Sequence, residues 1–310
     1  MVSIARHIRL TALTLATVAL AACNGTLTVN LTDTPVDDAT SVVIDFTGVE
    51  LHNTDGQTVT INFPSARQIN LLQLRNGATT ALLQGESVPS GSYDWIQLKV
   101  LATQNTQGQS YITLNTGAQY PLYVPGGSQS ALRINTGFSV PQSGSRHLII
   151  DFNLRQSVTS TDGQNYTLVP ALRVADQAQV GTITANMNLG ALATQQLGSA
   201  QASQCSGALF VFSGASATPQ NGGGASLVAF QPIRSFGATT PASSVSFPYL
   251  PKGSYTVAAT CDYGLYDPAA VPGQSTYQTL HWAVQSNVSV IANKTTTVSL
   301  PSGTTSNSVH

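Results

Sequence analysis

Charged residues are scarce in this chain of 310 residues. Lys and Arg number 12, Asp and Glu number 13, and together they make up 8% of the residues, whereas about a quarter is typical of soluble domains. The formal net charge is −1 and Lys and Arg form no cluster, which argues against a nucleic-acid partner, because neutralising phosphates takes several cations on one face. Apolar residues still make up 42% of the chain, enough to build a core.

Apolar runs long enough to cross a membrane are also absent. The segment Leu10–Leu20 is shorter than the roughly 20 residues of a spanning helix. It follows Arg6, His7 and Arg9, and a positive segment before a short apolar one is typical of an export signal. We therefore expect residues 1–22 to be a signal peptide.

The end of this signal carries a motif. Residues 20–23, Leu-Ala-Ala-Cys, resemble the lipobox of bacterial lipoproteins. The resemblance implies cleavage before Cys23, acylation of its sulfur with chains such as palmitate, and attachment to membrane lipid in the cell envelope. It favours the outer over the inner membrane, because Asn24 rather than Asp follows the cysteine. The alternative is an ordinary secretory signal that leaves Cys23 as a free thiol.

Cysteines number only three. With Cys23 acylated, Cys205 and Cys261 remain, and export implies an oxidising compartment in which a pair persists as a disulfide. Closing the loop between them would stabilise the fold by roughly 4 kcal/mol in the chain-entropy model. A metal site or a catalytic thiol is the alternative, but neither cysteine lies in a C-x-x-C pair.

The remaining chain is rich in strand signals. Short segments of Val, Ile, Thr and aromatic residues mostly alternate apolar with polar positions, and Gly- and Pro-containing turns separate them. This pattern predicts strands, with one short helical turn within 70–83, a polar Gln-rich connection at 191–203 and a flexible glycine tip at 221–224. We expect an all-β fold with two antiparallel β-sandwich modules, Ig-like or transthyretin-like, after the lipoprotein signal peptide.

Charge also divides the chain. Beyond residue 176 only three basic and two acidic residues occur. This shift in composition predicts a domain boundary. We expect a lipid-anchored first domain at 23–178, a second domain at 179–302 and a flexible tail at 303–310.

A short sequence recurs in both halves. Pro-x-Gly-Ser-Tyr occurs at 89–93 and again at 251–255, where proline presets a turn, glycine permits it, and tyrosine packs as the next strand begins. The second copy resembles the L-P-x-G-x-Y turn of transthyretin-like and carboxypeptidase-regulatory-like sandwiches. This resemblance implies a related architecture for the second domain, not a shared function.

The first domain carries a broader resemblance. Its sequence at 25–52, 69–72, 91–98, 123–127, 151–158 and 168–173 is similar, in consistent order, to a bacterial and archaeal lipoprotein family, family 4382 among the domains of unknown function. The resemblance implies an exported β-rich module, common at the amino terminus of lipoproteins, without established chemistry.

Acidic residues gather after the first expected strand. Asp33, Asp37 and Asp38 offer oxygen ligands that suit calcium. The calcium-loop pattern D-x-[DN]-x-[DN]-G is absent, and the alternative interpretation, which we favour, is that these side chains cap turns. Calcium is the one cofactor this leaves open.

Two further sets of residues are candidates for binding. Tyr93, Trp95 and Tyr123 would suit a sugar-stacking platform, although alternation predicts that Trp95 faces the core. Asp151 lies near two arginines, Arg155 and Arg173. These three would bind an anion or, in the interpretation we favour, pair with one another structurally.

Signals for catalysis are weak. No G-x-S-x-G or phosphate-binding glycine loop occurs, and the chain has two glutamates where glycosidase chemistry needs paired acids. We therefore expect a non-catalytic cell-envelope lipoprotein, not an enzyme, with a surface-interaction or structural role and an envelope protein or glycan as partner. The alternative is a carbohydrate- or calcium-dependent ligand-binding lipoprotein, and an envelope hydrolase ranks third.

Overall fold

The structure is a computed structural model. The signal peptide, Cys23 and the tail at 303–310 lie outside the part of the chain that it describes. Within that part, no helix combines the length and the apolar character needed to cross a membrane. The described residues are 24–301 without 35–38, 75–76, 105, 107, 126–131, 161, 170, 223, 225 and 234–242.

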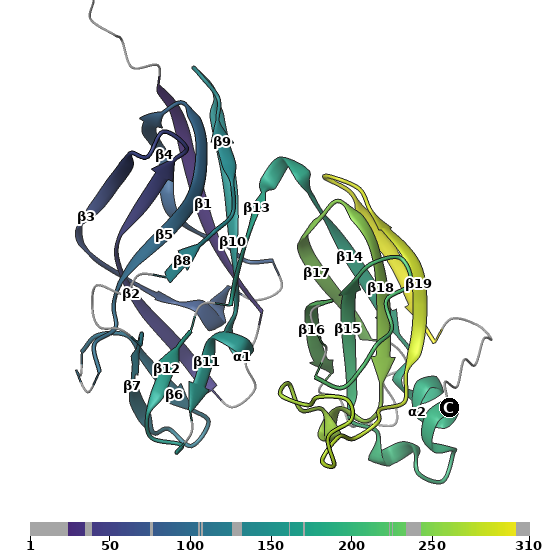
Figure 1. The fold of residues 1–310 in the computed structure, drawn as a ribbon. Coiled ribbons are helices and arrows are strands. Elements are labelled where there is room, and N and C mark those ends of the chain that lie inside the picture. Colours follow the sequence, from purple (N-terminus) through teal and green to yellow (C-terminus); the bar gives the residue numbers. More distant parts are fainter. Residues whose placement is uncertain are drawn as a thin grey trace, which may run out of the picture.

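Strands make up most of the regular structure, which confirms the all-β prediction. They form two β-sandwich domains side by side, one over 24–176 and one over 180–300 (Figure 1). A single 3-10 turn, Gln177–Gln179, connects them. We call them the first and second domains.

The first domain pairs two sheets around one core. Its strands are β1 (Asn24–Thr34), β2 (Ala39–Asn53), β3 (Thr58–Asn70), β4 (Thr80–Pro89), β5 (Gly91–Leu101), β6 (Tyr111–Leu114), β7 (Gln119–Tyr123), β8 (Leu132–Ile134), β9 (Phe138–Val140), β10 (Ser145–Asn153), β11 (Val158–Ser160), β12 (Tyr166–Leu168) and β13 (Leu172–Asp176). One sheet has the order β13-β10-β1-β4 and the other β11-β12-β7-β6-β2-β5-β8, with β3 beside β2 and β9 beside β5. β1 and β10 are parallel, whereas most other neighbours are antiparallel.

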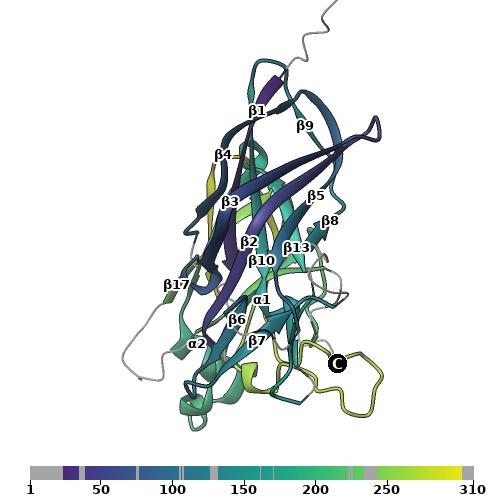
Figure 2. The same cartoon turned by 90° about the vertical axis from the view of Figure 1, so that its left-hand side faces the viewer.

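The core of the first domain follows the alternation of its strands. Leu27, Val29 and Leu31 on β1 are fully buried, as are Ile44 and Phe46 on β2. Burying such side chains is the main stabilising contribution, at about 1.5–3 kcal/mol each. The β3-β2-β5 face is turned away from the second domain (Figure 2).

The second domain also consists of two sheets, ordered β17-β14-β20 and β16-β15-β18-β19, with β14 and β20 parallel. Each domain therefore pairs its first strand in parallel with a later one, an exception to the antiparallel pattern that we expected. The strands are β14 (Val180–Met187), β15 (Gly207–Ser213), β16 (Leu227–Ile233), β17 (Ser243–Pro251), β18 (Gly253–Thr260), β19 (Ala283–Val290) and β20 (Thr295–Leu300).

Helices are few and short. The expected turn within 70–83 is one 3-10 turn, Leu71–Gln73, capped by Asn70, and the chain then enters β4. The Gln-rich connection instead contains a helix, α2 (Leu189–Leu197), because Asn188 accepts a bond from the amide of Ala191 and so caps its start. The helix α1 (Leu154–Ser157) is a single turn after β10. The other 3-10 turns are Ala202–Gln204 and Tyr263–Leu265.

The repeated Pro-x-Gly-Ser-Tyr sequence forms the same corner in both domains. It joins β4 to β5 and β17 to β18. The Tyr93 hydroxyl donates to the carbonyl of Pro89 at 2.6 Å, and the Tyr255 hydroxyl donates to the carbonyl of Pro251 at 2.6 Å. Burial raises the pKa of each tyrosine above its ordinary value.

One sheet of the second domain is buried on both faces. Leu209 and Val211 of β15 point between the two sheets, while Phe210 and Phe212 point outward. The outward phenylalanines are also fully buried, because the segment after β18 covers them with Tyr266 and Trp282. The continuous apolar sequence of β15 reflects this double burial.

Candidate functional site

The two domains meet along one sheet of the first domain. β1 and β13 lie against β16 and β17 of the second domain. On β10, Leu148 and Ile150 point into the first-domain core, whereas Ile149 points the other way. Ile149 is nevertheless only 1% exposed, which means that the second domain covers this face.

A shallow pocket lies in this seam. Thr32, Asp33, Asp151 and Arg173 line it from the first domain, and residues of β16 and β17 line it from the second. Its space holds about two water molecules. The seam pocket is therefore too small for a sugar ring.

Three polar side chains of the seam pocket are bonded within the first domain. Asp151 and Arg173 face each other across β10 and β13, and Nη2 of Arg173 donates to Oδ2 of Asp151 at 2.6 Å. The Thr32 hydroxyl lies 3.2 Å from the carbonyl of Leu74 and 3.0 Å from that of Ala78. The Asp151–Arg173 pair is the structural pairing that we favoured over an anion site.

Arg155, the second arginine of the anion hypothesis, reaches the other domain. Its guanidinium carbon lies 4.8 Å from the ring centroid of Phe230, 5.5 Å from that of Tyr263 and 5.8 Å from that of Tyr266. Its Nη2 donates to the Tyr263 hydroxyl. Burial raises the pKa of Tyr266 to about 12, and the positive charge of Arg155 opposes this rise, as expected for groups in close proximity.

The acidic candidates for calcium are only partly described. Asp37 and Asp38 lie outside the described residues. Asp33 is 6% exposed and lines the seam pocket, not an open loop. The described part of the chain brings no three His, Cys, Asp or Glu residues together as a metal site would require.

The three aromatic candidates do not form one platform. Tyr93 is 2% exposed and stacks on Phe138 inside the first domain, with ring centroids 5.0 Å apart. Tyr123 lies at the end of β7, and Trp95 lies on β5. A buried ring offers no face to a sugar, so Tyr93 is excluded from a stacking surface.

Trp95 faces outward, which corrects the expectation that it points into the core. A register shift between His52 and Asn53 places Tyr93 opposite Asn53 and Trp95 opposite His52. The extra residue, Asp94, reverses the alternation, as a β-bulge does. The bulge turns Tyr93 inward. Trp95 lies outward because the strand beyond the bulge alternates regularly, with Ile96 and Leu98 buried and Trp95 on the same face as Gln97.

The outward indole already has two partners. The His52 ring stacks on it with centroids 5.0 Å apart, and the Arg133 guanidinium carbon lies 4.2 Å from its centroid. His52 comes from β2 and Arg133 from β8, which flank β5 on opposite sides, so the indole lies between them. Trp95 is thus a packed surface residue, not a free stacking face.

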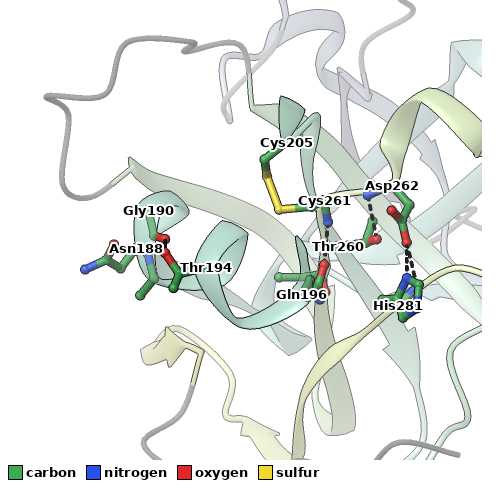
Figure 3. Close-up of a disulfide and its surroundings, with 11 residues drawn as sticks. Asn188, Gly190, Thr194, Gln196, Cys205, Thr260, Cys261, Asp262 and His281 are labelled. Atoms are coloured by element: carbon green, nitrogen blue, oxygen red, sulfur yellow. Dashed lines mark hydrogen bonds and ion pairs between the residues drawn. A yellow bond between two sulfur atoms is a disulfide. The ribbon is translucent and has the colours of Figure 1, made fainter. Parts of the chain in front are cut away.

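The disulfide between Cys205 and Cys261 is present, as predicted. Both cysteines are buried, and Figure 3 shows Gln196 of α2 beside them. The Gln196 side chain accepts from the amide of Cys261 and donates to the carbonyl of Ala259. The helix and the disulfide therefore fix the end of β18 together.

The segment after the disulfide is held by side chains. Asp262 accepts from the His281 imidazole at 2.9 Å (Figure 3). Asn221, within the expected flexible tip, is 1% exposed. The side-chain Nδ2 of Asn221 donates to the carbonyls of Leu265 and Gln278, and its Oδ1 accepts from the backbone amide of Asp267. Asn221 is therefore held in place by its side chain and is not a mobile tip.

Sequence reasoning missed the aromatic partners of Arg155. Phe230, Tyr263 and Tyr266 lie in the second domain, where aromatic residues had no assigned role. A usable signal was the spacing of Tyr263 and Tyr266 directly after Cys261: a disulfide next to two aromatics indicates a fixed apolar surface. Nothing in the sequence indicates that Arg155 reaches it.

The first domain also matches a known family. Residues 24–170 match the model described as Domain of unknown function (DUF4382). The resemblance predicted for this half of the chain is therefore confirmed. The interface with the second domain includes residues that this model matches, Arg155 among them. No curated protein sequence matches the chain.

Solved structures show only distant likeness. A leucine-rich repeat protein from Bacteroides thetaiotaomicron is 14% identical over 90% of this chain and 26% of its own, with a TM-score of 0.19. The minor pilin GBS52 from Streptococcus agalactiae is 11% identical over 88% and 94%, with a TM-score of 0.18. The fimbrial anchor protein Mfa2 from Porphyromonas gingivalis is 11% identical over 77% and 79%, with a TM-score of 0.18. TM-scores this low do not support an inference about the function of this chain.

Proposed function

We propose that the chain is a non-catalytic lipoprotein of the bacterial cell envelope. In this proposal acylated Cys23 anchors it to the outer membrane, and its two β-sandwich domains have a structural or surface-interaction role. One observation carries the proposal: Asn24, the residue next to the proposed lipid-bearing cysteine, is already part of strand β1. A first domain anchored at Cys23 would therefore stand close to the membrane surface.

The placement of the domains supports this role. The start of β1 and the connecting turn Gln177–Gln179 lie at the same end of the molecule (Figure 1). Both domains then extend away from that end, so an anchor at Cys23 directs both of them away from the membrane. The buried Cys205–Cys261 disulfide adds support, since such bonds persist in exported proteins.

A non-catalytic role agrees with how the charged groups are used. Asp151 pairs with Arg173, Arg146 with Asp176, and Lys99 with Glu50. These pairs connect neighbouring strands, and of the three only Asp151–Arg173 lines the seam pocket. We further propose that the second domain is related in architecture to transthyretin-like sandwiches, on the strength of its Tyr255 corner.

The test is the chemical state of Cys23 in a bacterial host. Mass spectrometry of the amino-terminal peptide is expected to show a diacylglyceryl adduct and an N-terminus at Cys23. Labelled palmitate is expected to enter the wild type and the Cys205→Ser/Cys261→Ser control but not Cys23→Ala. Membrane fractionation then reports the compartment. An unmodified Cys23, or cleavage elsewhere, contradicts the anchor.

A further inference from the structure

Arg155 of the first domain contacts three aromatic rings of the second domain. We propose that Arg155 and its aromatic receptor, made of Phe230, Tyr263 and Tyr266, are a latch that holds the two domains in one fixed orientation. The inference concerns the body of the molecule and does not depend on the lipid anchor.

The latch lies far from the turn that connects the two domains, where it can restrain their rotation about that turn. The only covalent connection between the domains is the turn Gln177–Gln179 at one end, whereas α1 with Arg155 lies far along the seam from it (Figure 1). Rotation about that turn would draw Arg155 out of its receptor. A second bond, from the Tyr249 hydroxyl to the carbonyl of Gly77 at 2.9 Å, also crosses the seam.

The receptor rings pack against one another within the second domain. Tyr266 lies against Phe230 at 5.5 Å, Tyr263 at 6.1 Å and Phe210 at 5.0 Å between ring centroids. Aromatic rings packed in this way restrain one another. The receptor therefore does not have to form when the domains meet.

The disulfide fixes the base of this receptor. Ser206, next to Cys205, donates its amide to the carbonyl of Cys261 and accepts from the amide of Tyr263. The 3-10 turn that carries Tyr263 thus begins two residues after a covalent crosslink. Any displacement of Tyr263 would strain these bonds.

The first domain holds Arg155 equally firmly. Leu154 and Ser157, on the same helical turn, are fully buried in the first domain. Asn153 caps the turn by accepting from the amide of Gln156. A planar guanidinium fixed at its base suits stacking on rings and a directed bond to a hydroxyl, which a lysine ammonium does not reproduce.

The test compares domain arrangement in solution. Residues 23–310 with Cys23→Ser are measured by small-angle X-ray scattering, alone and with Arg155→Ala. The unmodified latch is expected to give one narrow distance distribution, and Arg155→Ala a broader one with a larger maximum dimension. The matched control is Arg67→Ala, which removes an arginine lying 4.1 Å from the Phe63 ring within the first domain and is expected to leave the distribution unchanged.

Two further variants keep the proposal falsifiable if Arg155→Ala folds poorly. Arg155→Lys keeps the charge but not the planar fork, and Tyr263→Phe removes only the accepting hydroxyl. Both are expected to broaden the distribution less than Arg155→Ala. The proposal fails if Arg155→Ala, folded by circular dichroism, gives the wild-type distribution, or if Arg155→Lys and Tyr263→Phe both do so when Arg155→Ala does not fold.

Discussion

The two domains share the same Pro-x-Gly-Ser-Tyr turn, but they differ in what lies on the outer faces of their sheets. Tyr93 and Tyr255 make the same bond to a proline carbonyl four residues earlier. In the first domain, the outer face of β2 and β5 carries polar and charged side chains together with Trp95. In the second, the outer face of β15 and β18 is a second apolar cluster beneath an irregular segment.

This difference explains the uneven distribution of charge along the chain. The outer face of the first domain holds Glu50, Gln97 and Lys99, which bond to one another and to Asn62 across three strands. Phe210 and Phe212 occupy the comparable face of the second domain. A sheet covered on both sides has no place for solvated charges, and its cover supplies the surface that receives Arg155.

The chain offers separate reporters for the two domains. Its two tryptophans are Trp95 in the first domain and Trp282 in the second. With Trp95→Phe, fluorescence follows the second domain, and with Trp282→Phe it follows the first. Each prediction below is measured in these two backgrounds by urea unfolding.

The largest expected effect is loss of the disulfide. In Cys205→Ser/Cys261→Ser, the free energy of unfolding of the second domain is expected to fall by roughly 4 kcal/mol, because a long loop regains its freedom in the unfolded chain. Trp282 emission reports this loss, while the Trp95 transition stays in place. An unchanged Trp282 midpoint would show that the crosslink contributes little.

The second prediction concerns the outer faces directly. Phe210→Ala leaves a cavity in a buried aromatic cluster and is expected to cost the second domain roughly 3–4 kcal/mol. His52→Ala takes one ring from the half-exposed Trp95 stack and is expected to cost the first domain less than about 1 kcal/mol. Equal losses would remove the distinction between a buried and a solvated outer face.

The sequence predicted much of this fold where local patterns decide it. Strand-forming segments, the Cys205–Cys261 pair and the repeated tyrosine turn all follow from residue type and spacing. The inward position of Tyr93 does not, because one extra residue, Asp94, reverses the alternation and nothing in the sequence marks it as a bulge. The outward position of Trp95 does follow from the residues after it, since the apolar Ile96 and Leu98 alternate with it and are buried.

Contacts between distant segments lay beyond sequence reasoning. The Arg155 latch joins α1 to residues from β16 and from the segment after β18, and no periodicity encodes such a meeting. Asn221 lies in a glycine-rich segment that indicates a mobile tip. Its four bonds, which depend on residues 44 or more positions away as well as on its neighbour, make it a fixed one.

The third prediction tests what the domains share. Tyr93→Phe and Tyr255→Phe each remove one hydroxyl from an equivalent bond and leave a proline carbonyl without its donor. Each is expected to cost its own domain about 1 kcal/mol, measured with the reporter of that domain. Unequal losses would mean that the two corners are alike in geometry but not in energy.

The smallest expected effect separates the domains by pH. Asp45 on β2 is 3% exposed, and its Oδ1 has no hydrogen-bond partner in the described part of the chain. Burial raises the pKa of this carboxyl above its ordinary value, and a bond from Gln68 opposes the rise. A raised pKa means that the folded state binds the proton more tightly than the unfolded state.

The sign of the pH effect follows from this preference. The contribution of Asp45 to stability is fully present below the unfolded pKa of about 3.9 and is lost as the pH rises through the folded pKa. Asp45→Asn cannot ionise, so its stability relative to wild type is expected to increase from pH 3 to pH 7, by less than the tyrosine variants lose. Taking the difference between the two proteins cancels the other carboxyls. The effect belongs to the Trp95 transition alone, and a pH-independent difference would show that Asp45 ionises as freely in the folded domain as in the unfolded chain.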